Sequence, residues 1–106
     1  MNHTETIRVD FSDGIVTLTF DEPNSPVNTM CKAWQRDIVS VTDAILAAKD
    51  QVRGIILASA KKVFFAGADL KGVMRSTPDE ATAVFEEIET TTRCFRALET
   101  LGIPVV

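Results

Sequence analysis

The sequence has 106 residues, 45% apolar content and a net charge of −4, which is typical of one small globular domain and excludes a disordered chain. The negative charge offers no basic surface, so we expect no nucleic-acid partner. No apolar run approaches the roughly 18 residues of a membrane span, and the N-terminus lacks the features of a secretory signal. We therefore expect a cytoplasmic protein without a membrane span.

The first part of the chain predicts a β-hairpin followed by a loop. Residues 7–11 alternate apolar and polar side chains, which is the period of a half-buried strand. Residues 12–14 contain a glycine turn, and residues 15–20 are rich in β-branched and aromatic side chains, so the two segments should pair. Residues 21–26 include two prolines, which exclude regular strand pairing and predict a loop.

A helix and a third strand are predicted next. From Thr29, a candidate N-cap, apolar residues recur at steps of three and four, the pattern of an amphipathic helix. The apolar stripe of this helix consists of Trp34, Ile38, Val41, Ile45 and Ala48. Residues 53–58 then form a short apolar run, which favours a strand covered on both faces, as in a parallel sheet.

A second long helix is predicted from residue 77. Residues 77–80 (Thr-Pro-Asp-Glu) form a capping box with proline at the first helical position. The apolar stripe includes Ala81, Val84, Ile88, Phe95 and Leu98. Gly102 is expected to end the helix, and residues 103–106 begin another apolar strand. Because a domain rarely finishes within a core strand, whose exposed edge would invite aggregation, we interpret the chain as a fragment.

Residues 64–71 (Phe-Phe-Ala-Gly-Ala-Asp-Leu-Lys) are the most informative segment for chemistry. Small residues flank a glycine, and such a turn lets main-chain N–H groups face a ligand without side chains in the way. At a helix start these N–H groups also lie at the positive end of the peptide dipoles, which suits a developing negative oxygen. From spacing alone, a plain tight turn into a helix is the simpler interpretation.

Two motifs in this sequence resemble those of the crotonase (enoyl-CoA hydratase) family. Residues 65–71 (Phe-Ala-Gly-Ala-Asp-Leu-Lys) resemble the family signature. Residues 23–29 (Pro-Asn-Ser-Pro-Val-Asn-Thr) resemble its earlier loop, especially in the hydratase domain of multifunctional fatty-acid oxidation α-subunits. The resemblance covers nearly the whole chain. It implies an α/β fold, the N-terminal part of the crotonase (ClpP-like) ββα spiral, with residues 1–106 opening an enoyl-CoA hydratase/isomerase domain.

The resemblance also implies roles for particular residues. Ala68, directly after the signature glycine, would donate its backbone N–H to the thioester carbonyl. Other positions would bind acyl-CoA: Pro26, Val27, Ala66, Gly67, Asp69, Leu70 and Lys71. Lys71 meets a phosphate in this interpretation, although a solvated lysine explains it equally well. The family's second oxyanion donor and its two catalytic glutamates lie on segments beyond Val106, so the fragment alone is expected to be inactive.

The implied reaction is hydration of 2-trans-enoyl-CoA to 3-hydroxyacyl-CoA in fatty-acid β-oxidation. Coenzyme A enters as part of the substrate, and NAD is expected only if the parent protein also has a 3-hydroxyacyl-CoA dehydrogenase domain. The implied assembly is a trimer-based homo-oligomer or a complex with a thiolase β-subunit. Two alternatives stay open: another crotonase-family reaction, such as Δ3-Δ2 isomerisation, thioester hydrolysis or decarboxylation, and a non-catalytic acyl-CoA-binding module.

Other candidate residues favour structural interpretations. Three carboxylates on the second predicted helix lie off its apolar stripe, which predicts a solvated face: Glu86, Glu87 and Glu89. His3, the only histidine, is expected in a frayed terminus. Cys31 and Cys94 lie far apart and are expected to be reduced, buried thiols. We find neither metal-ligand spacing nor a glycine-rich dinucleotide loop, and we expect no metal.

Overall fold

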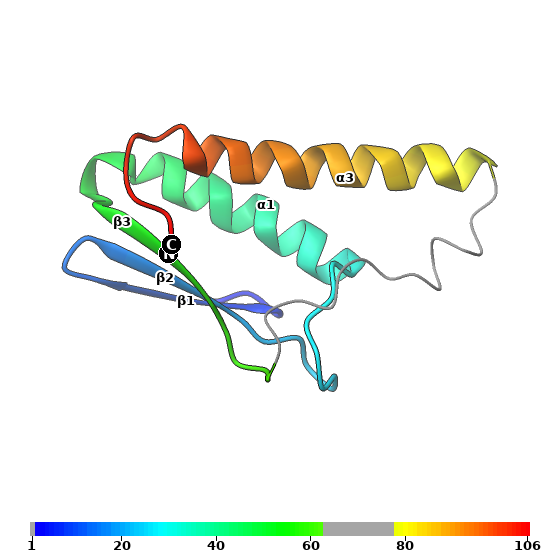
Figure 1. Cartoon of the computed structure of the whole chain (residues 1–106), viewed down its shortest axis with the longest axis horizontal. Helices are drawn as coiled ribbons and strands as arrows, with labels where there is room; N and C mark the ends of the chain where they lie inside the picture. Colours follow the sequence, from blue (N-terminus) through cyan, green and yellow to red (C-terminus); the bar gives the residue numbers. More distant parts are fainter. Residues whose placement is uncertain (1, 63–77) are drawn as a thin grey trace.

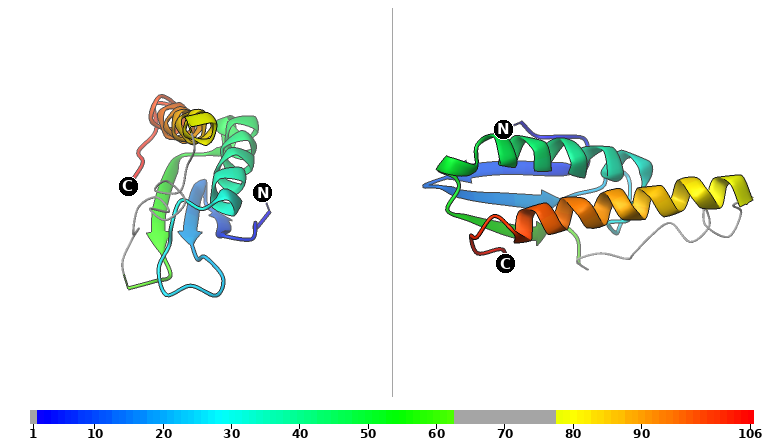
Figure 2. Two further views of the ribbon diagram at one scale, coloured as in Figure 1. Left: turned by 90° about the vertical axis from the view of Figure 1, so that its right-hand side faces the viewer. Right: turned by 90° about the horizontal axis from the view of Figure 1, so that it is seen from above.

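The computed structural model describes residues 2–62 and 78–106, which form a sheet layer and a helix layer (Figure 1). The sheet contains three strands in the order β1-β2-β3. The elements in chain order are β1 (Ile7–Ser12), β2 (Ile15–Phe20), α1 (Lys32–Ala47), a short 3₁₀ helix (Lys49–Gln51), β3 (Gly54–Ser59) and α3 (Pro78–Glu99). The two long helices lie side by side over the same face of the sheet (Figure 2).

The predicted hairpin is confirmed. Strands β1 and β2 pair in antiparallel register, with Ser12 opposite Ile15 at the turn. Asp13 and Gly14 connect the strands with φ angles of 52° and 81°. Two consecutive residues with positive φ are typical of the hairpin turns whose twist matches that of the strands. Gly14 suits this position because it has no Cβ to oppose a positive φ.

The third strand is parallel to β2, as predicted. Val16 lies opposite Ile55, and Leu18 lies opposite Leu57. The connection between β2 and β3 contains α1, which covers the inner face of the sheet (Figure 1). The expected burial on both faces is not observed for Ile56, whose side chain is 42% exposed. Its face of the sheet is open to solvent at this point.

The C-terminal residues begin to add a strand beside β3, as expected for residues 103–106. Val105 forms a parallel bridge with Ile55. The N–H of Ile55 donates to the carbonyl of Pro104 at 2.9 Å, and the N–H of Val106 donates to the carbonyl of Ile55 at 2.9 Å. These bonds satisfy part of the β3 edge that would otherwise be unpaired.

Helix α1 supplies the centre of the core, and its predicted stripe is largely correct. Trp34, Ile38, Val41 and Ile45 are all buried and pack with the inward side chains of the sheet. The predicted N-cap at Thr29 is wrong, because the helix begins at Lys32 and Cys31 occupies the N-cap position. The amide and hydroxyl of Thr29 instead donate to the carboxylate of Glu22.

Helix α3 begins at Pro78, in agreement with the predicted position of proline in the first turn. Leu98 is buried, but Ile88 is 53% exposed, so its predicted place in the apolar stripe is wrong. The N-terminal part of α3 extends past the N-terminal end of α1 (Figures 1 and 2). Thr91 bonds to Gln35 in the first turn of α1, so Ile88, one turn earlier in α3, lies at the edge of the contact between the two helices. Thr77 and the side chains of Ala81 and Val84 lie outside the described part of the chain.

Candidate functional site

The candidate site lies where the carboxyl ends of the parallel strands β2 and β3 meet. The loop after β2 contains Pro26, which is exposed, and Val27, which is half-buried. The chain after β3 leads through Lys61 and Lys62 directly toward the predicted signature. The signature itself lies outside the described residues, and with it Ala66, Gly67, Ala68, Asp69, Leu70 and Lys71. The structure therefore describes two segments of the candidate site: residues 60–62, which precede the signature in the sequence, and the loop after β2.

Asn28 links these two segments through its buried side-chain amide. Its Oδ1 accepts a hydrogen bond from the backbone N–H of Glu22 at 3.0 Å. Its Nδ2 donates to the carbonyl of Phe20 at 3.0 Å and to Oγ of Ser59 at 2.9 Å. The residue is only 1% exposed, so these bonds replace water for both ends of the amide. One side chain thus connects the end of β2, the loop and the end of β3.

Glu22 organises the second half of the loop. Its carboxylate accepts hydrogen bonds from the backbone N–H of Thr29 at 3.2 Å and from the Thr29 hydroxyl at 2.6 Å. Burial by itself raises the pKa of Glu22, but hydrogen bonds donated by Thr29, Cys31 and Ser25 together lower the pKa below its ordinary value. The ionised carboxylate therefore holds the two ends of the loop together through its hydrogen bonds with Thr29.

Lys61 ties the segment after β3 to the same loop. Its Nζ donates to the carbonyl of Glu22 at 2.9 Å and pairs with the Asp21 carboxylate at 2.8 Å. The hydrogen bond from Lys61 lowers the pKa of Asp21, and the positive charges of Lys61 and of Arg8, at 3.7 Å, add to this effect. The backbone N–H of Lys61 also donates to Oγ of Ser59 at 3.0 Å.

A local turn shapes the stretch that contains the predicted binding positions. The Ser25 hydroxyl donates to the carbonyl of Val27 at 2.7 Å and accepts from the Val27 N–H at 3.3 Å. Asn24 has a φ of 59°, in the left-handed region that asparagine tolerates better than most residues. The loop therefore presents Pro26 and Val27 on a defined backbone.

The comparison with known families identifies this arrangement. The family described as enoyl-CoA hydratase/isomerase matches residues 10–106. The chain belongs to the enoyl-CoA hydratase/isomerase family. The match includes both the loop around Asn28 and the signature, the two segments on which the sequence resemblance was based. The predicted family is confirmed.

The curated relatives share one description. The chain is 36% identical over 95 residues to the fatty acid oxidation complex subunit alpha of Shewanella halifaxensis. It is 35% identical over 94 residues to the protein of the same description from Pseudomonas putida. These alignments cover 89% and 88% of this chain but 13% of each relative, so the chain spans about an eighth of their length.

Solved structures confirm the fold class. An enoyl-CoA hydratase from Mycobacterium smegmatis superposes with a TM-score of 0.74 at 26% identity, covering 94% of this chain and 38% of that one. An enoyl-CoA hydratase from Bacillus anthracis gives a TM-score of 0.75 at 24% identity with the same coverage, which shows the fold alone. The chain therefore has the α/β crotonase fold over the part that it covers.

The sequence analysis missed the hydrogen-bonding roles of Glu22, Asn28 and Lys61. It placed the asparagine within the loop that resembles the family, and it assigned no role to Glu22 or Lys61. Glu22 and Lys61 lie two residues after the ends of β2 and β3, which was the available signal for these two residues, whereas Asn28 lies further along the loop and carried no such signal. Polar side chains that follow two neighbouring parallel strands are brought together at one edge of a sheet.

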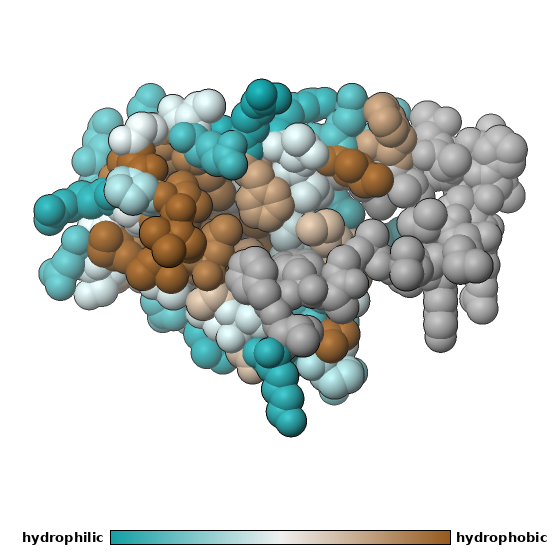
Figure 3. Space-filling model, in the orientation of Figure 1, coloured by the Kyte–Doolittle hydropathy of each residue, from teal (hydrophilic) through white to brown (hydrophobic). Residues whose placement is uncertain are grey.

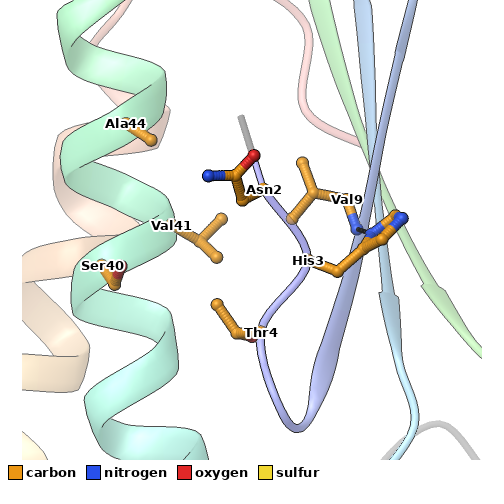
Figure 4. A pocket seen from close by; sticks show the side chains of 7 residues that line it. All are labelled: Asn2, His3, Thr4, Val9, Ser40, Val41 and Ala44. Atoms are coloured by element: carbon orange, nitrogen blue, oxygen red, sulfur yellow. Dashed lines mark hydrogen bonds between the residues drawn. The ribbon is translucent and has the colours of Figure 1, made fainter.

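His3 is ordered, contrary to the expectation of a frayed terminus. Its Nδ1 accepts a hydrogen bond from the backbone N–H of Val9 at 2.8 Å (Figure 4). It lines a pocket of about 260 Å³ between the N-terminal segment, β1 and α1. None of the residues that line this pocket carries a carboxylate or a thiol, so it offers no acid–base pair or nucleophile of that kind.

The remaining candidate groups have structural environments. Glu86 and Glu89 are exposed, as predicted, while the side chain of Glu87 lies outside the described part. Cys94 is buried and Cys31 half-buried, both as free thiols, and burial raises the pKa of Cys31. Among the described residues, no cluster of three or more His, Cys, Asp or Glu side chains is placed to hold a metal ion. No helix within residues 2–62 and 78–106 has the length and apolarity required to cross a membrane.

Proposed function

We propose that the protein hydrates 2-trans-enoyl-CoA to 3-hydroxyacyl-CoA in fatty-acid β-oxidation, and that residues 1–106 contribute the first part of its acyl-CoA site. The observation that carries the proposal is the loop of residues 23–29, which resembles the family's ligand loop. Its Asn28 bonds to Ser59 at the end of β3, and Lys61 bonds to Glu22 just before the loop. Family membership and the fatty acid oxidation relatives support the same reaction.

The chemistry explains why such a site needs backbone donors. Addition of water places its oxygen on carbon 3 and a proton on carbon 2, through a state in which negative charge develops on the thioester oxygen. The N–H of Ala68 would donate to this oxygen together with a second donor beyond Val106. Removing one donor from an oxyanion hole costs about 10² to 10³ in rate. A general acid and a general base are also required, and we place both on segments that follow Val106.

The wider assignment covers the whole protein. The relatives' description as the α-subunit of a fatty acid oxidation complex supports a multifunctional enzyme. Such a protein would include an NAD-dependent 3-hydroxyacyl-CoA dehydrogenase and would assemble with a thiolase β-subunit, the alternative being a trimer-based homo-oligomer. The isomerase activity is the second candidate function, because the family description covers hydratases and isomerases alike.

Hydration of crotonyl-CoA by the full-length protein tests the proposal directly. Loss of the conjugated enoyl thioester reports hydration, while formation of the conjugated thioester from a 3-enoyl-CoA reports isomerisation. Turnover of crotonyl-CoA to 3-hydroxybutyryl-CoA is the expected result. Binding of crotonyl-CoA without turnover of either substrate would reject the hydratase and identify the protein as an acyl-CoA-binding module.

A further inference from the structure

The hydrogen bonds at the candidate site form a closed ring through four residues. Asn28 Nδ2 donates to Ser59 Oγ, which also accepts from the backbone N–H of Lys61. Lys61 Nζ donates to the carbonyl of Glu22, and the N–H of Glu22 donates back to Asn28 Oδ1. Glu22 and Asn28 belong to the loop after β2. Ser59 is the last residue of β3, and Lys61 lies two residues further along the chain.

We propose that Asn28 is a positioning residue that holds the predicted acyl-CoA loop in a fixed place relative to the chain entering the signature. The inference rests on the proposed function, because that function makes Pro26 and Val27 part of the substrate site. Asn28 belongs to the loop, but its side chain is buried, so it acts through the neighbours to which it is hydrogen-bonded. It is therefore distinct from the residues expected to touch acyl-CoA.

The chemistry of the side chain explains why an amide occupies this position. The Asn28 amide donates to Phe20 and Ser59 and accepts from Glu22, and a carboxamide provides both functions on a single planar group. An aspartate has nearly the same shape and retains the acceptor for Glu22, but it cannot donate to Phe20 and Ser59. The substitution would remove the two hydrogen bonds that tie residue 28 to the ends of β2 and β3 and would place an acceptor-only carboxylate against two oxygen acceptors, of which the Phe20 carbonyl also accepts from Ala60 and Ser59 Oγ from Lys61.

Lys61 makes the ring resistant to displacement. Its side chain is 15% exposed and bonds to both Asp21 and Glu22, so its charge is neutralised where the loop begins. Because the ring is closed, the loop cannot move relative to Ser59 without breaking a bond on the Asn28 side and another on the Lys61 side. A ligand that contacts both segments needs this fixed separation, since a displacement of about 1 Å at a reacting site can cost 10²-fold in rate.

A purely structural role is the competing interpretation, and it predicts a different kinetic result. A structural residue lowers stability wherever it lies, whereas a positioning residue changes substrate binding beyond the effect of lost stability. Gly14 provides the matched control, because it lies in the hairpin turn at the opposite end of β2. Gly14→Ala is expected to lower the unfolding temperature while leaving the loop and its ring intact.

The experiment compares Asn28→Asp, Ser59→Ala and Gly14→Ala in the full-length protein with crotonyl-CoA. For Asn28→Asp we expect KM to rise about tenfold, which corresponds to one effective hydrogen bond, and for Ser59→Ala we expect a smaller rise. Gly14→Ala should lower the unfolding temperature about as much as Asn28→Asp does, but it should leave KM unchanged. Equal KM values in Asn28→Asp and Gly14→Ala would overturn the positioning role. If Asn28→Asp does not fold, Ser59→Ala decides the question by the same comparison.

Amide hydrogen exchange separates this inference from the proposed function. In Asn28→Asp, the amides of residues 22–29 and 59–61 should gain exchange together, because the ring couples the two segments. Faster exchange in only one segment would overturn the inference even in an active enzyme. If exchange is faster in both segments of Asn28→Asp but the wild-type protein does not hydrate crotonyl-CoA, the link between the two segments is supported and the proposed reaction is rejected.

Discussion

At the scale of single residues, the part of the proposed reaction that this chain would contribute is one backbone donor. Ala68 follows the glycine of the family signature, and its N–H is the donor that the chain would contribute to the thioester oxygen. An alanine side chain takes no part in this interaction. The contribution of Ala68 is therefore tested by removing the N–H and not by truncating the side chain.

Replacing Ala68 with proline removes this N–H. We expect the hydration rate of the full-length protein to fall about 10²- to 10³-fold, the effect of losing one oxyanion donor. Ala68→Gly is the matched control, because it retains the N–H and should keep most of the activity. Circular dichroism must show that the proline variant is folded. A folded Ala68→Pro enzyme with the wild-type rate would contradict the oxyanion assignment.

The Glu22 carboxylate predicts a pH dependence of stability. Burial raises its pKa, but the hydrogen bonds from Thr29, Cys31 and Ser25 together lower it below the ordinary value of 4.5. The unfolded chain therefore binds this proton at a higher pH than the folded chain does. The resulting stabilisation is complete above the unfolded pKa and is lost as the pH falls through the folded pKa.

Denaturant titrations between neutral and acidic pH measure this effect. The unfolding free energy of the wild-type protein should fall as the pH drops below 4.5, and Glu22→Gln should fall less steeply, because its side chain does not titrate. Thr29→Val removes the hydroxyl that donates to Glu22 at 2.6 Å and should flatten the profile part of the way. If the unfolding free energy falls equally with decreasing pH in all three proteins, protonation of Glu22 does not contribute to the acid destabilisation.

At the scale of elements, the hairpin turn isolates the effect of one glycine. Gly14 has a φ of 81°, and a Cβ at this position would lie 2.7 Å from Cδ of Arg53. Gly102 has a similar φ of 78°, but a Cβ there would meet no atom within 4 Å. The two glycines thus share a positive φ and differ in the space around them.

Gly14→Ala should therefore destabilise the protein more than Gly102→Ala. Strain from a positive φ costs about 1 kcal/mol or more in each variant. The contact with Arg53 adds to this cost only at position 14, and because it involves a side chain, Arg53→Ala should recover part of the loss. Unfolding free energies from urea titration provide the comparison. Equal losses in the two alanine variants would show that the arginine moves aside without cost.

The elements also show which features the sequence could predict. Alternation in residues 7–11 and the Asp-Gly pair after Ser12 are local signals, and they predicted the hairpin correctly. The start of α1 was misplaced because Thr29, a good capping residue in isolation, is bonded to Glu22 in the folded chain. Ile88 was misplaced because helical periodicity does not reveal how far a neighbouring helix extends.

At the candidate site, too, local sequence signals must be distinguished from contacts that depend on the fold. The resemblance predicted the loop with Pro26 and Val27, because that information resides in a short run of residues. The bond between Asn28 and Ser59 joins residues 31 positions apart, and it exists only because β2 and β3 are parallel neighbours. No local pattern encodes such a contact. The ring through Asn28 could therefore be found only from the folded structure.

At the scale of the whole molecule, apolar side chains collect on the surface of the chain. Figure 3 shows hydrophobic residues gathered over β3 and the C-terminal segment. Val106 is 80% exposed and Ile56 42% exposed, and on α3 Phe85 and Ile88 are 62% and 53% exposed. Single exposed apolar residues are normal, but contiguous groups of them favour association.

We expect the 106-residue chain expressed alone to self-associate through these surfaces. Sedimentation velocity at increasing concentration measures the effect, and the weight-average sedimentation coefficient should rise with concentration. The double variant Ile56→Lys and Ile88→Lys should shift the chain toward monomer, since both side chains are exposed and their substitution creates no core cavity. Lysines at Asn2 and Gln51, which are exposed polar residues on neither β3 nor α3, form the control pair and should change association less. A wild-type chain that stays monomeric and unfolds cooperatively would show that this surface is too small to drive association.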